Sequence, residues 1–466
     1  MSNKKIANGE RETFGSRLGF VLISAGCAIG LGNVWRFPSI TASYGGAAFI
    51  VLYLIFLVVF GLPIMSMEFA VGRASGKGIG GAFTTLKPQK PAWKGFSWVA
   101  IVGNYALMSF YTLVTAWMFI YMFKMVSGDM IGQTPENIVN QFSAIKADAP
   151  LLLLSTLGVI VLGILICSFG VQGGLEKVNK IMMLVLLGLI LVLVGYVAFL
   201  DGSGAGYYFY LVPDFNKLTA NFGEALFAAM GQAFFTLSIG MGSMTIFGSY
   251  IKKDRKLFGE ALVVSALDTG VAMCSGLIII PACFAFGVGL DGGTNLIFHA
   301  LPNVFNSMGP VMGRVIGGVF FLFLIFAAMS TVTAVFENLI AFGMDKWGWS
   351  RRKSCLINLL IVSVICVPSV LGFNVLSGIM PLGAGSNIMD LMDFIVSNNI
   401  LPLGSLAFVI FCSYKNAGWG WKSFIKEVNT GKGLGLSAKL KPYVKFIIPI
   451  MLLALWVWGY VDLFII

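Results

Sequence analysis

Long apolar runs alternate with short polar loops along the chain, and eleven of the runs are long enough to cross a bilayer as a helix of about 20 residues. Strict alternation of apolar and polar residues, which a membrane barrel needs, is not evident. The pattern predicts an all-α polytopic membrane protein with a single transmembrane domain over residues 1–466. The predicted spans are Arg17–Ile40, Gly46–Val71, Phe96–Met125, Leu151–Phe169, Val178–Leu200, Phe222–Tyr250, Phe258–Val288, Arg314–Asp345, Ser354–Phe373, Asn387–Ser413 and Val444–Phe464.

Two of the predicted spans, the first and the sixth, are interrupted by small and polar residues. The first contains Gly30, Asn33 and Arg36, and the sixth contains the segment Phe235–Gly242. A broken helix at membrane depth is tolerated only where protein or a water-filled cavity satisfies the freed backbone groups. Both breaks therefore indicate a binding site.

The two interrupted spans cross the membrane in opposite directions, because an odd number of crossings separates their starts. Glycine-interrupted spans at corresponding positions of two halves are typical of transporters built from inverted repeats. We therefore predict one repeat over about residues 11–200, a second over about 222–413, and an additional eleventh helix over about 444–464.

The charge pattern sets the expected orientation. Hydrophobic residues make up 58% of the chain, and the formal net charge is +11. All but five of the 31 lysines and arginines fall in loops on one side of the predicted membrane. This bias follows the positive-inside rule and explains the charge without nucleic-acid binding. It predicts a cell-membrane protein with a cytoplasmic N-terminus and an extracytoplasmic C-terminus.

The residue types in the chain give little support for an enzyme. The seven cysteines form no metal-ligand spacing, and the chain has a single histidine. A membrane-embedded hydrolase would need a nucleophile–base pair or a metal motif, and neither is visible. We therefore expect no catalytic residues.

Several motifs, spread over nearly the whole chain, carry a family resemblance. The chain resembles the neurotransmitter:sodium symporter family, in particular its bacterial amino-acid transporters. The resemblance implies a LeuT-like fold, with a 5+5 inverted repeat, discontinuous helices 1 and 6 and an eleventh helix. It also implies sodium-coupled symport by alternating access. The matching segments are Arg17–Gly19, Gly30–Pro38, Gly45–Phe49, Gly231–Ser238, Ala327–Thr331 and Met389–Phe394.

The resemblance implies two sites for Na⁺, a hard cation that prefers oxygen ligands. The first would use the substrate carboxylate together with oxygens of Ala28, Asn33, Thr236 and Asp268. The second would use carbonyls of Gly26, Ile29 and Ala327 with the hydroxyls of Ser330 and Thr331. An alternative for the two hydroxyls is bonding back to their own helix.

Asp268 allows two interpretations. Chloride-dependent animal members of the family have a serine where this chain has Ala272. The fixed carboxylate of Asp268 would replace the charge of chloride, which predicts chloride-independent transport. Alternatively, Asp268 is a structural partner of Gln232.

The substrate site implied by the family lies between the two breaks. Monoamine transporters carry an aspartate where this chain has Gly30, so the resemblance favours an α-amino acid. The apolar wall, with the flexible Met241, favours a hydrophobic or aromatic side chain such as that of tyrosine or tryptophan. Alternatives are a small neutral amino acid or amine derivative, proton coupling, or a sensor that binds without transport. The expected substrate residues are Ala28, Gly30, Leu31, Gly32, Leu107, Tyr111, Phe235, Thr236, Ser238, Met241, Val332 and Val335.

Two charge pairs match the gates of the family. Arg36 and Asp393 would form the outer pair, above Tyr111 and Phe235. The inner gate would consist of Arg11, Asp345 and the ring of Phe14. The alternative is that these pairs are fixed salt bridges at helix ends.

Two further acids, Glu68 and Glu337, lie inside predicted spans. We expect Glu68 to accept hydrogen bonds from the unwound part of the sixth span. The sequence suggests no partner for Glu337.

Overall fold

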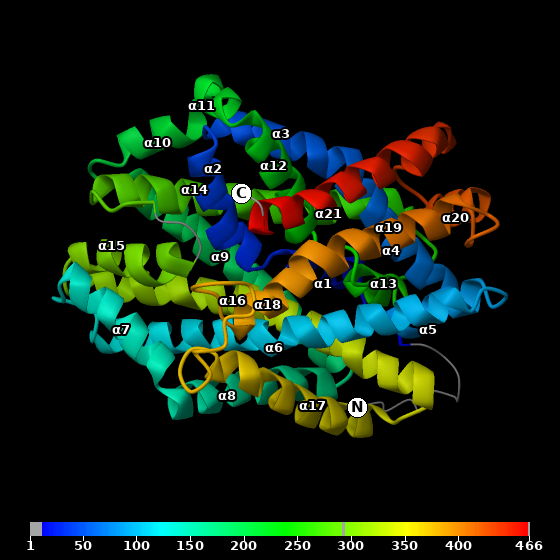
Figure 1. Ribbon diagram of the computed structural model, residues 1–466, viewed down its shortest axis with the longest axis horizontal. Helices are drawn as coiled ribbons and strands as arrows, with labels where there is room; N and C mark the ends of the chain where they lie inside the picture. The colour runs from blue at the N-terminus through cyan, green and yellow to red at the C-terminus, as the bar shows by residue number, and fades with distance from the viewer. Residues whose placement is uncertain (1–11, 291–293, 465–466) are drawn as a thin grey trace.

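The computed structural model describes residues 12–290 and 294–464, and nearly all of its regular structure is helical. Long helices run side by side along the molecule (Figure 1). In the described part of the chain, nine helical runs are long and apolar enough to cross a membrane. They are α3–η2–α4 (Ala47–Ser75), α6 (Ala92–Ser127), α8 (Ala149–Ser168), η3–α9 (Val171–Ala198), α14 (Leu257–Ala285), α16 (Met312–Trp347), α17 (Arg351–Leu371), α18–η5–α19 (Ile388–Ser413) and η6–η7–α21 (Ala438–Phe464).

The two remaining predicted spans are the broken ones. The first comprises α1 (Arg17–Ala28) and the run η1–α2 (Gly32–Ser43), which meet at an angle of 60°. The sixth comprises α12 (Phe222–Thr236) and α13 (Ser243–Gly248), with Leu237–Gly242 between them. The predicted interruptions are therefore confirmed.

Left-handed backbone makes the second break possible. Gly240 and Gly242 have φ values of 102° and 79°, which favour glycine, and Ser238 has a φ of 50°. A Cβ atom on Gly240 would also lie 2.2 Å from the carbonyl oxygen of Leu401. Gly240 is thus required by both its conformation and the close approach of α19 (Leu401–Ser413).

Short helices cover the ends of the long ones. They are α5 (Ile79–Leu86), α7 (Pro135–Ala147), α10 (Gly204–Leu211), α11 (Phe215–Ala220), η4 (Leu296–Ala300), α15 (Leu301–Ser307) and α20 (Trp421–Val428).

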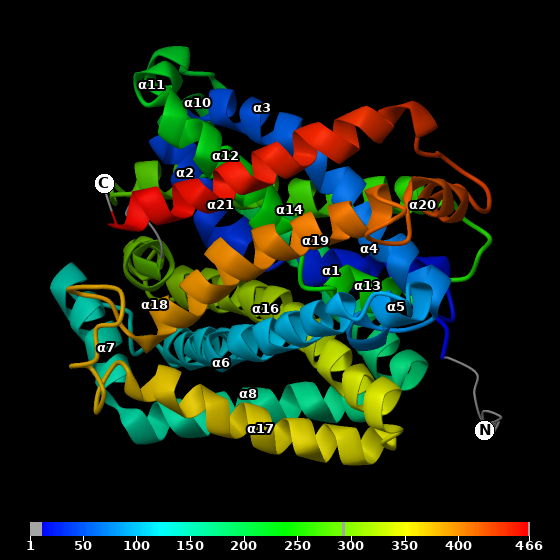
Figure 2. The same cartoon turned by 45° about the vertical axis from the view of Figure 1, so that its right-hand side comes forward.

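The start of α1 and the end of α21 lie at opposite ends of the molecule, and α5 and α20 lie near the start of α1 (Figure 2). This arrangement fits an odd number of crossings. Which end faces the cytoplasm stays a prediction from the charge pattern.

The outer helices leave many apolar side chains exposed, as lipid-facing helices do. Leu154 of α8, Leu191 of α9, Leu360 of α17 and Ile450 of α21 are each more than 60% exposed. The broken helices α1 and α13 are instead almost completely buried. Lipid therefore contacts the outer helices, whereas the unwound segments lie in the protein interior.

Candidate transport site

The unwound segments of α1 and α12 border a small cavity of about 30 Å³. Three of the predicted substrate residues, Thr236, Val332 and Val335, do not line it, whereas Val396 and Leu401 of the tenth span do. Thr331, predicted as an ion ligand, also lines it. The other predicted substrate residues lining the cavity are Ala28, Gly30, Leu31, Gly32, Leu107, Tyr111, Phe235, Ser238 and Met241.

Glycines allow large side chains to approach the unwound backbone of the first span. A Cβ atom on Gly30 would lie 2.8 Å from the hydroxyl oxygen of Tyr111, and one on Gly32 would lie 2.5 Å from the ring of Phe235. Both distances are shorter than van der Waals contact. The glycines therefore let Tyr111 and Phe235 close against this segment.

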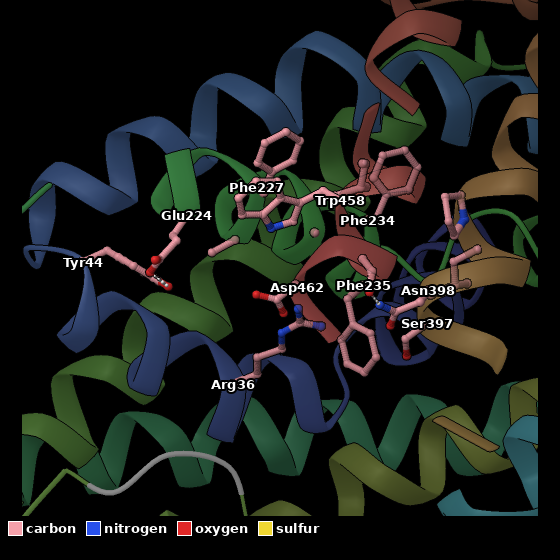
Figure 3. A pocket seen from close by; sticks show the side chains of 16 residues that line it. Arg36, Tyr44, Glu224, Phe227, Phe234, Phe235, Ser397, Asn398, Trp458 and Asp462 are labelled. Carbon is pink, nitrogen blue, oxygen red and sulfur yellow. Dashed lines mark hydrogen bonds between the residues drawn. The ribbon is translucent and has the colours of Figure 1, made fainter. Parts of the chain in front are cut away.

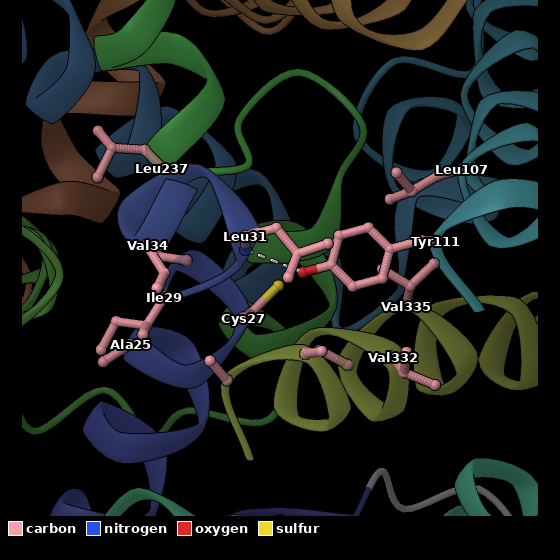
Figure 4. Packing of buried hydrophobic residues seen from close by; sticks show 14 of the residues in the cluster. Ala25, Cys27, Ile29, Leu31, Val34, Leu107, Tyr111, Leu237, Val332 and Val335 are labelled. Atoms are coloured by element: carbon pink, nitrogen blue, oxygen red, sulfur yellow. Dashed lines mark hydrogen bonds between the residues drawn. The ribbon is translucent and has the colours of Figure 1, made fainter. Parts of the chain in front are cut away.

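Amide groups of the first break point at polar partners. The N–H of Leu31 donates to the hydroxyl oxygen of Tyr111 at 3.3 Å, as Figure 4 shows. The N–H of Gly30 donates to Oδ1 of Asn33 at 3.0 Å. Amides before a helical turn attract a carboxylate when they are free. In this conformation Asn33 and Tyr111 occupy these two amides, so a substrate carboxylate would have to displace or join them.

Asp268 of α14 joins the two broken helices. The side-chain amide of Asn33 donates to Oδ1 of Asp268 at 2.8 Å, and the hydroxyl of Thr236 donates to Oδ2 at 2.8 Å. Asp268 has no exposed surface. Three residues of the predicted first ion site are therefore in direct contact.

Gln232 does not pair with Asp268, so that alternative is wrong. Its side-chain amide donates instead to the carbonyl oxygen of Gly32 at 3.1 Å. Gln232 therefore holds the first break against α12.

Four of the five predicted ligands of the second ion site meet between α1 and α16. The hydroxyl of Ser330 donates to the carbonyl oxygens of Gly26 and Ala327, at 2.7 and 2.8 Å. Thr331 lies 3.4 Å from the carbonyl oxygen of Gly26. The hydroxyls of Ser330 and Thr331 thus lie close both to a carbonyl of their own helix and to a carbonyl of α1.

The fifth predicted ligand, Ile29, has extended backbone directly after α1, so its carbonyl is released from the helix. In the described chain, no group of three or more histidine, cysteine, aspartate or glutamate side chains could hold a metal ion. Carbonyl and hydroxyl oxygens are ligands suited to a hard monovalent cation. The oxygens of the two predicted ion sites are therefore chemically suited to Na⁺.

The outer pair is not in contact. The ion pairs within 4 Å among residues 12–290 and 294–464 do not include Arg36 with Asp393. Arg36 lies over the ring of Phe235, at 5.1 Å from its centroid, and Asp393 accepts a hydrogen bond from Ser397 at 2.7 Å. The alternative of a fixed salt bridge between them therefore does not hold in this conformation, and the role of the two residues as an outer gate stays a prediction.

A pocket of about 180 Å³ lies outside Phe235. Figure 3 shows Arg36 pointing into it beside Asp462 of α21, with Glu224 farther along the wall. The pocket gives the buried guanidinium a polar environment, which a charge at membrane depth requires.

At the inner end, Phe14 is buried beside the start of α1. Its ring contacts those of Phe20, Phe247 and Tyr250, and its N–H donates to the carbonyl oxygen of Tyr250 at 3.1 Å. Asp345 accepts a hydrogen bond from the N–H of Gly78 at 3.2 Å. Arg11, the predicted partner of Asp345, lies outside the described residues.

Glu68 has the role expected from the sequence. Its carboxylate accepts a hydrogen bond from the N–H of Gly240 at 2.5 Å and another from the hydroxyl of Thr245 at 3.4 Å. The carboxylate thereby satisfies donors of the second break, and the prediction is confirmed.

Sequence reasoning missed the partners of Glu337. The guanidinium of Arg351 donates to both of its carboxylate oxygens, at 2.7 and 2.9 Å, and the hydroxyl of Tyr250 donates at 2.7 Å. A buried acid near the inner end of a span signals that a cation is needed. Because Lys346, Arg352 and Lys353 lie close by in the sequence, the pattern did not identify which one.

Two broken helices that cross in opposite directions around a polar core define a secondary transporter. The chain matches the model of the Sodium:neurotransmitter symporter family over residues 11–149 and 147–464. The chain therefore belongs to this family, which is a family of transporters and not of enzymes. It is thus a multi-pass membrane protein with a LeuT-like fold.

Relatives agree with the family assignment. The uncharacterized sodium-dependent transporter YhdH of Bacillus subtilis is 30% identical, over 94% of this chain and 95% of that protein. The sodium- and chloride-dependent taurine transporter of Bos taurus is 27% identical, over 86% of this chain and 71% of that protein. The crystal structure of MhsT in complex with L-phenylalanine matches with a TM-score of 0.85 and 35% identity, over 97% of this chain and 100% of that chain.

Proposed function

We propose that the protein is a symporter that couples sodium entry to uptake of neutral hydrophobic or aromatic L-amino acids by alternating access. The observation that carries the proposal is the cavity between the two breaks, which combines backbone amides with an apolar wall. The similarity to MhsT, whose solved structure holds L-phenylalanine, supports an amino-acid substrate.

The composition of the cavity wall supports a neutral substrate. Among the lining residues there is no aspartate, glutamate, lysine or arginine. A charged substrate side chain would lose its hydration there without gaining a partner. Position 30 holds a glycine, so the wall offers no carboxylate to an amine that lacks its own acid.

The wall also supports a large substrate side chain. Leu31, Leu107, Met241, Val396 and Leu401 are the larger aliphatic side chains that line this space beside Phe235. Methionine adapts to irregular shapes because it has three rotatable bonds. In this conformation the space holds only about 30 Å³, so an aromatic or branched aliphatic substrate would bind after these side chains move apart.

Asp268 supports sodium coupling without chloride. This carboxylate is fully buried, and no ion pair within the described ranges involves it. A buried anion is costly without a cation, and Na⁺ between Asp268, Asn33 and Thr236 would supply one. Because this carboxylate is part of the protein itself, no bound chloride ion is needed to balance the charge of Na⁺.

The orientation follows from the charge pattern. We place the N-terminus in the cytoplasm and the end of α21 outside, because the lysine-rich loops gather at the end where α1 begins. The outer pocket at Arg36 would then open to the extracytoplasmic side, and Phe14 would close the cytoplasmic side.

Uptake into proteoliposomes tests the proposal directly. Radiolabelled phenylalanine should accumulate with an inward Na⁺ gradient, should not accumulate with choline, and should be unaffected when gluconate replaces chloride. Leucine and tryptophan should compete, whereas glutamate and lysine should not. Accumulation in choline driven by a proton gradient would show proton coupling, and sodium-dependent binding without uptake would show a sensor. Stronger competition by taurine or glycine than by leucine would show a different substrate class.

A further inference from the structure

Another pocket, of about 580 Å³, shares no lining residue with the cavity at the breaks and lies between the end of α19 and the start of the eleventh helix. Its wall includes four lysines, Lys415, Lys422, Lys441 and Lys445, and no acidic side chain. The short helix α20 (Trp421–Val428) forms one side of it. We infer that this pocket binds the phosphate headgroup of an anionic phospholipid.

The four lysines differ from other basic residues at this end of the molecule. Arg17, Arg73 and Arg351 form ion pairs with buried or half-buried glutamates. None of the ion pairs in the described part of the chain involves a lysine of the pocket. The positive-inside bias alone explains basic loops, but not four unpaired lysines that converge on one cavity.

The start of α20 adds further donors. Its N-cap is Gly420, whose φ of 89° lets the chain turn into the helix, and no side chain caps the first turn. The residues of that turn, Trp421, Lys422 and Ser423, line the pocket. Free amides at a helix N-terminus attract phosphate, and here they face the same cavity as the lysines.

The surroundings indicate a lipid rather than a soluble anion. Trp419 and Trp421 border the pocket, and tryptophan is enriched at the membrane–water interface. Lys445 lies over the rings of Tyr414 and Phe446, at 4.7 and 5.0 Å from their centroids. These rings hold the ammonium group of Lys445 at the start of the eleventh helix.

Apolar surface for acyl chains begins directly beside the lysines. Phe446, Ile447 and Ile450 are 55%, 47% and 64% exposed at the start of the eleventh helix. A phospholipid with its headgroup among the lysines would lay its chains along this face. Basic pockets beside membrane helices bind anionic headgroups in this way.

Native mass spectrometry of the detergent-solubilised full-length protein tests the inference. Dioleoyl phosphatidylglycerol should bind more tightly than dioleoyl phosphatidylcholine. The variant Lys422→Gln/Lys445→Gln should weaken phosphatidylglycerol binding by about tenfold or more, because each lysine near a headgroup contributes on the order of fivefold. Lys422→Arg/Lys445→Arg should retain the binding.

The matched control is Lys426→Gln/Lys439→Gln, which removes two nearby lysines that do not line the pocket. Equal loss in the control, or equal binding of the two lipids by the original protein, would overturn the inference. A separate measurement adds inorganic phosphate to the protein with bound phosphatidylglycerol. If phosphate alone displaces phosphatidylglycerol at similar concentrations, the site is one for a soluble anion and the lipid assignment is wrong. An unchanged unfolding temperature of each variant without lipid shows that the fold is intact.

Discussion

Glu337 and Arg351 form a bidentate ion pair at the inner end of α16, with N–O distances of 2.7 and 2.9 Å. Glu337 is fully buried, and the Arg351 side chain is 13% exposed. Tyr250, just after α13, donates to the same carboxylate, and Phe14 packs on the ring of Tyr250. The pair therefore connects α16 and α17 with the broken helices whose movement alternating access requires.

Removing one member of this pair should destabilise the protein. Glu337→Gln leaves the mostly buried guanidinium of Arg351 with only the more distant Glu12, at 3.7 Å, and should lower the free energy of unfolding by about 3 kcal/mol. The measurement is unfolding in mixed detergent and sodium dodecyl sulfate micelles. The exposed neighbour provides a control, because Arg352→Gln should change the free energy by less than about 0.5 kcal/mol.

A second variant separates ion pairing from packing. Glu337→Gln/Arg351→Met removes both charges and should recover more than half of the loss. If the double variant is as unstable as the sum of the two single ones, the pair contributes no coupling energy and the interpretation is wrong.

The sequence predicted the two breaks because glycine, asparagine and arginine are out of place in an apolar run. It also placed Asn33, Thr236 and Asp268 in one site, through the family resemblance, and these side chains are in contact. Such positions are predictable because a local backbone requirement and a matching motif coincide.

Other contacts depend on geometry that residue types do not encode. Val396 and Leu401 enter the cavity wall from a span whose π-helical turn, η5 (Phe394–Ile400), shifts the helical register away from a 3.6-residue period. The neighbours of Arg36, the ring of Phe235 on α12 and Asp462 on α21, come from spans far apart in the sequence. Neither effect leaves a pattern in the chain.

Asp268 should determine both sodium coupling and chloride independence. Asp268→Asn removes the buried negative charge and should reduce sodium-driven uptake at least about tenfold, because the ion loses its only charged protein ligand. The measurement is uptake into proteoliposomes over a range of Na⁺ concentrations. Asp254→Asn, in an exposed loop, should leave uptake unchanged.

Chloride should rescue the uncharged variant once a hydroxyl is available. We expect Asp268→Asn/Ala272→Ser to transport in chloride and to fail in gluconate. Transport by Asp268→Asn alone that equals the original protein in gluconate would show that the carboxylate does not replace an anion.

Met241 should set the size of the substrate side chain. Met241→Phe places a rigid ring in the cavity wall and should weaken binding of tryptophan relative to leucine by about tenfold, as overpacking costs about 1–3 kcal/mol. Competition against a radiolabelled substrate measures the ratio. Met312→Phe, at the exposed start of α16, is the control. If tryptophan and leucine lose affinity equally, the variant disturbs the whole site and does not change only the size of the side chain that it accepts.

Gly240 should be indispensable for the second break. Gly240→Ala would force a Cβ atom to 2.2 Å from the carbonyl oxygen of Leu401, at a φ of 102° that alanine rarely adopts. It would also displace the N–H that donates to Glu68. We expect loss of sodium-dependent substrate binding and a lower unfolding temperature. Gly270→Ala in α14, where a Cβ atom meets nothing within 4 Å, should leave binding intact and stabilise the helix by about 0.5–1 kcal/mol. Because both changes add one methyl group, only the local backbone and the contact with α19 account for a difference between them, and normal binding by Gly240→Ala would contradict the proposed role of the break.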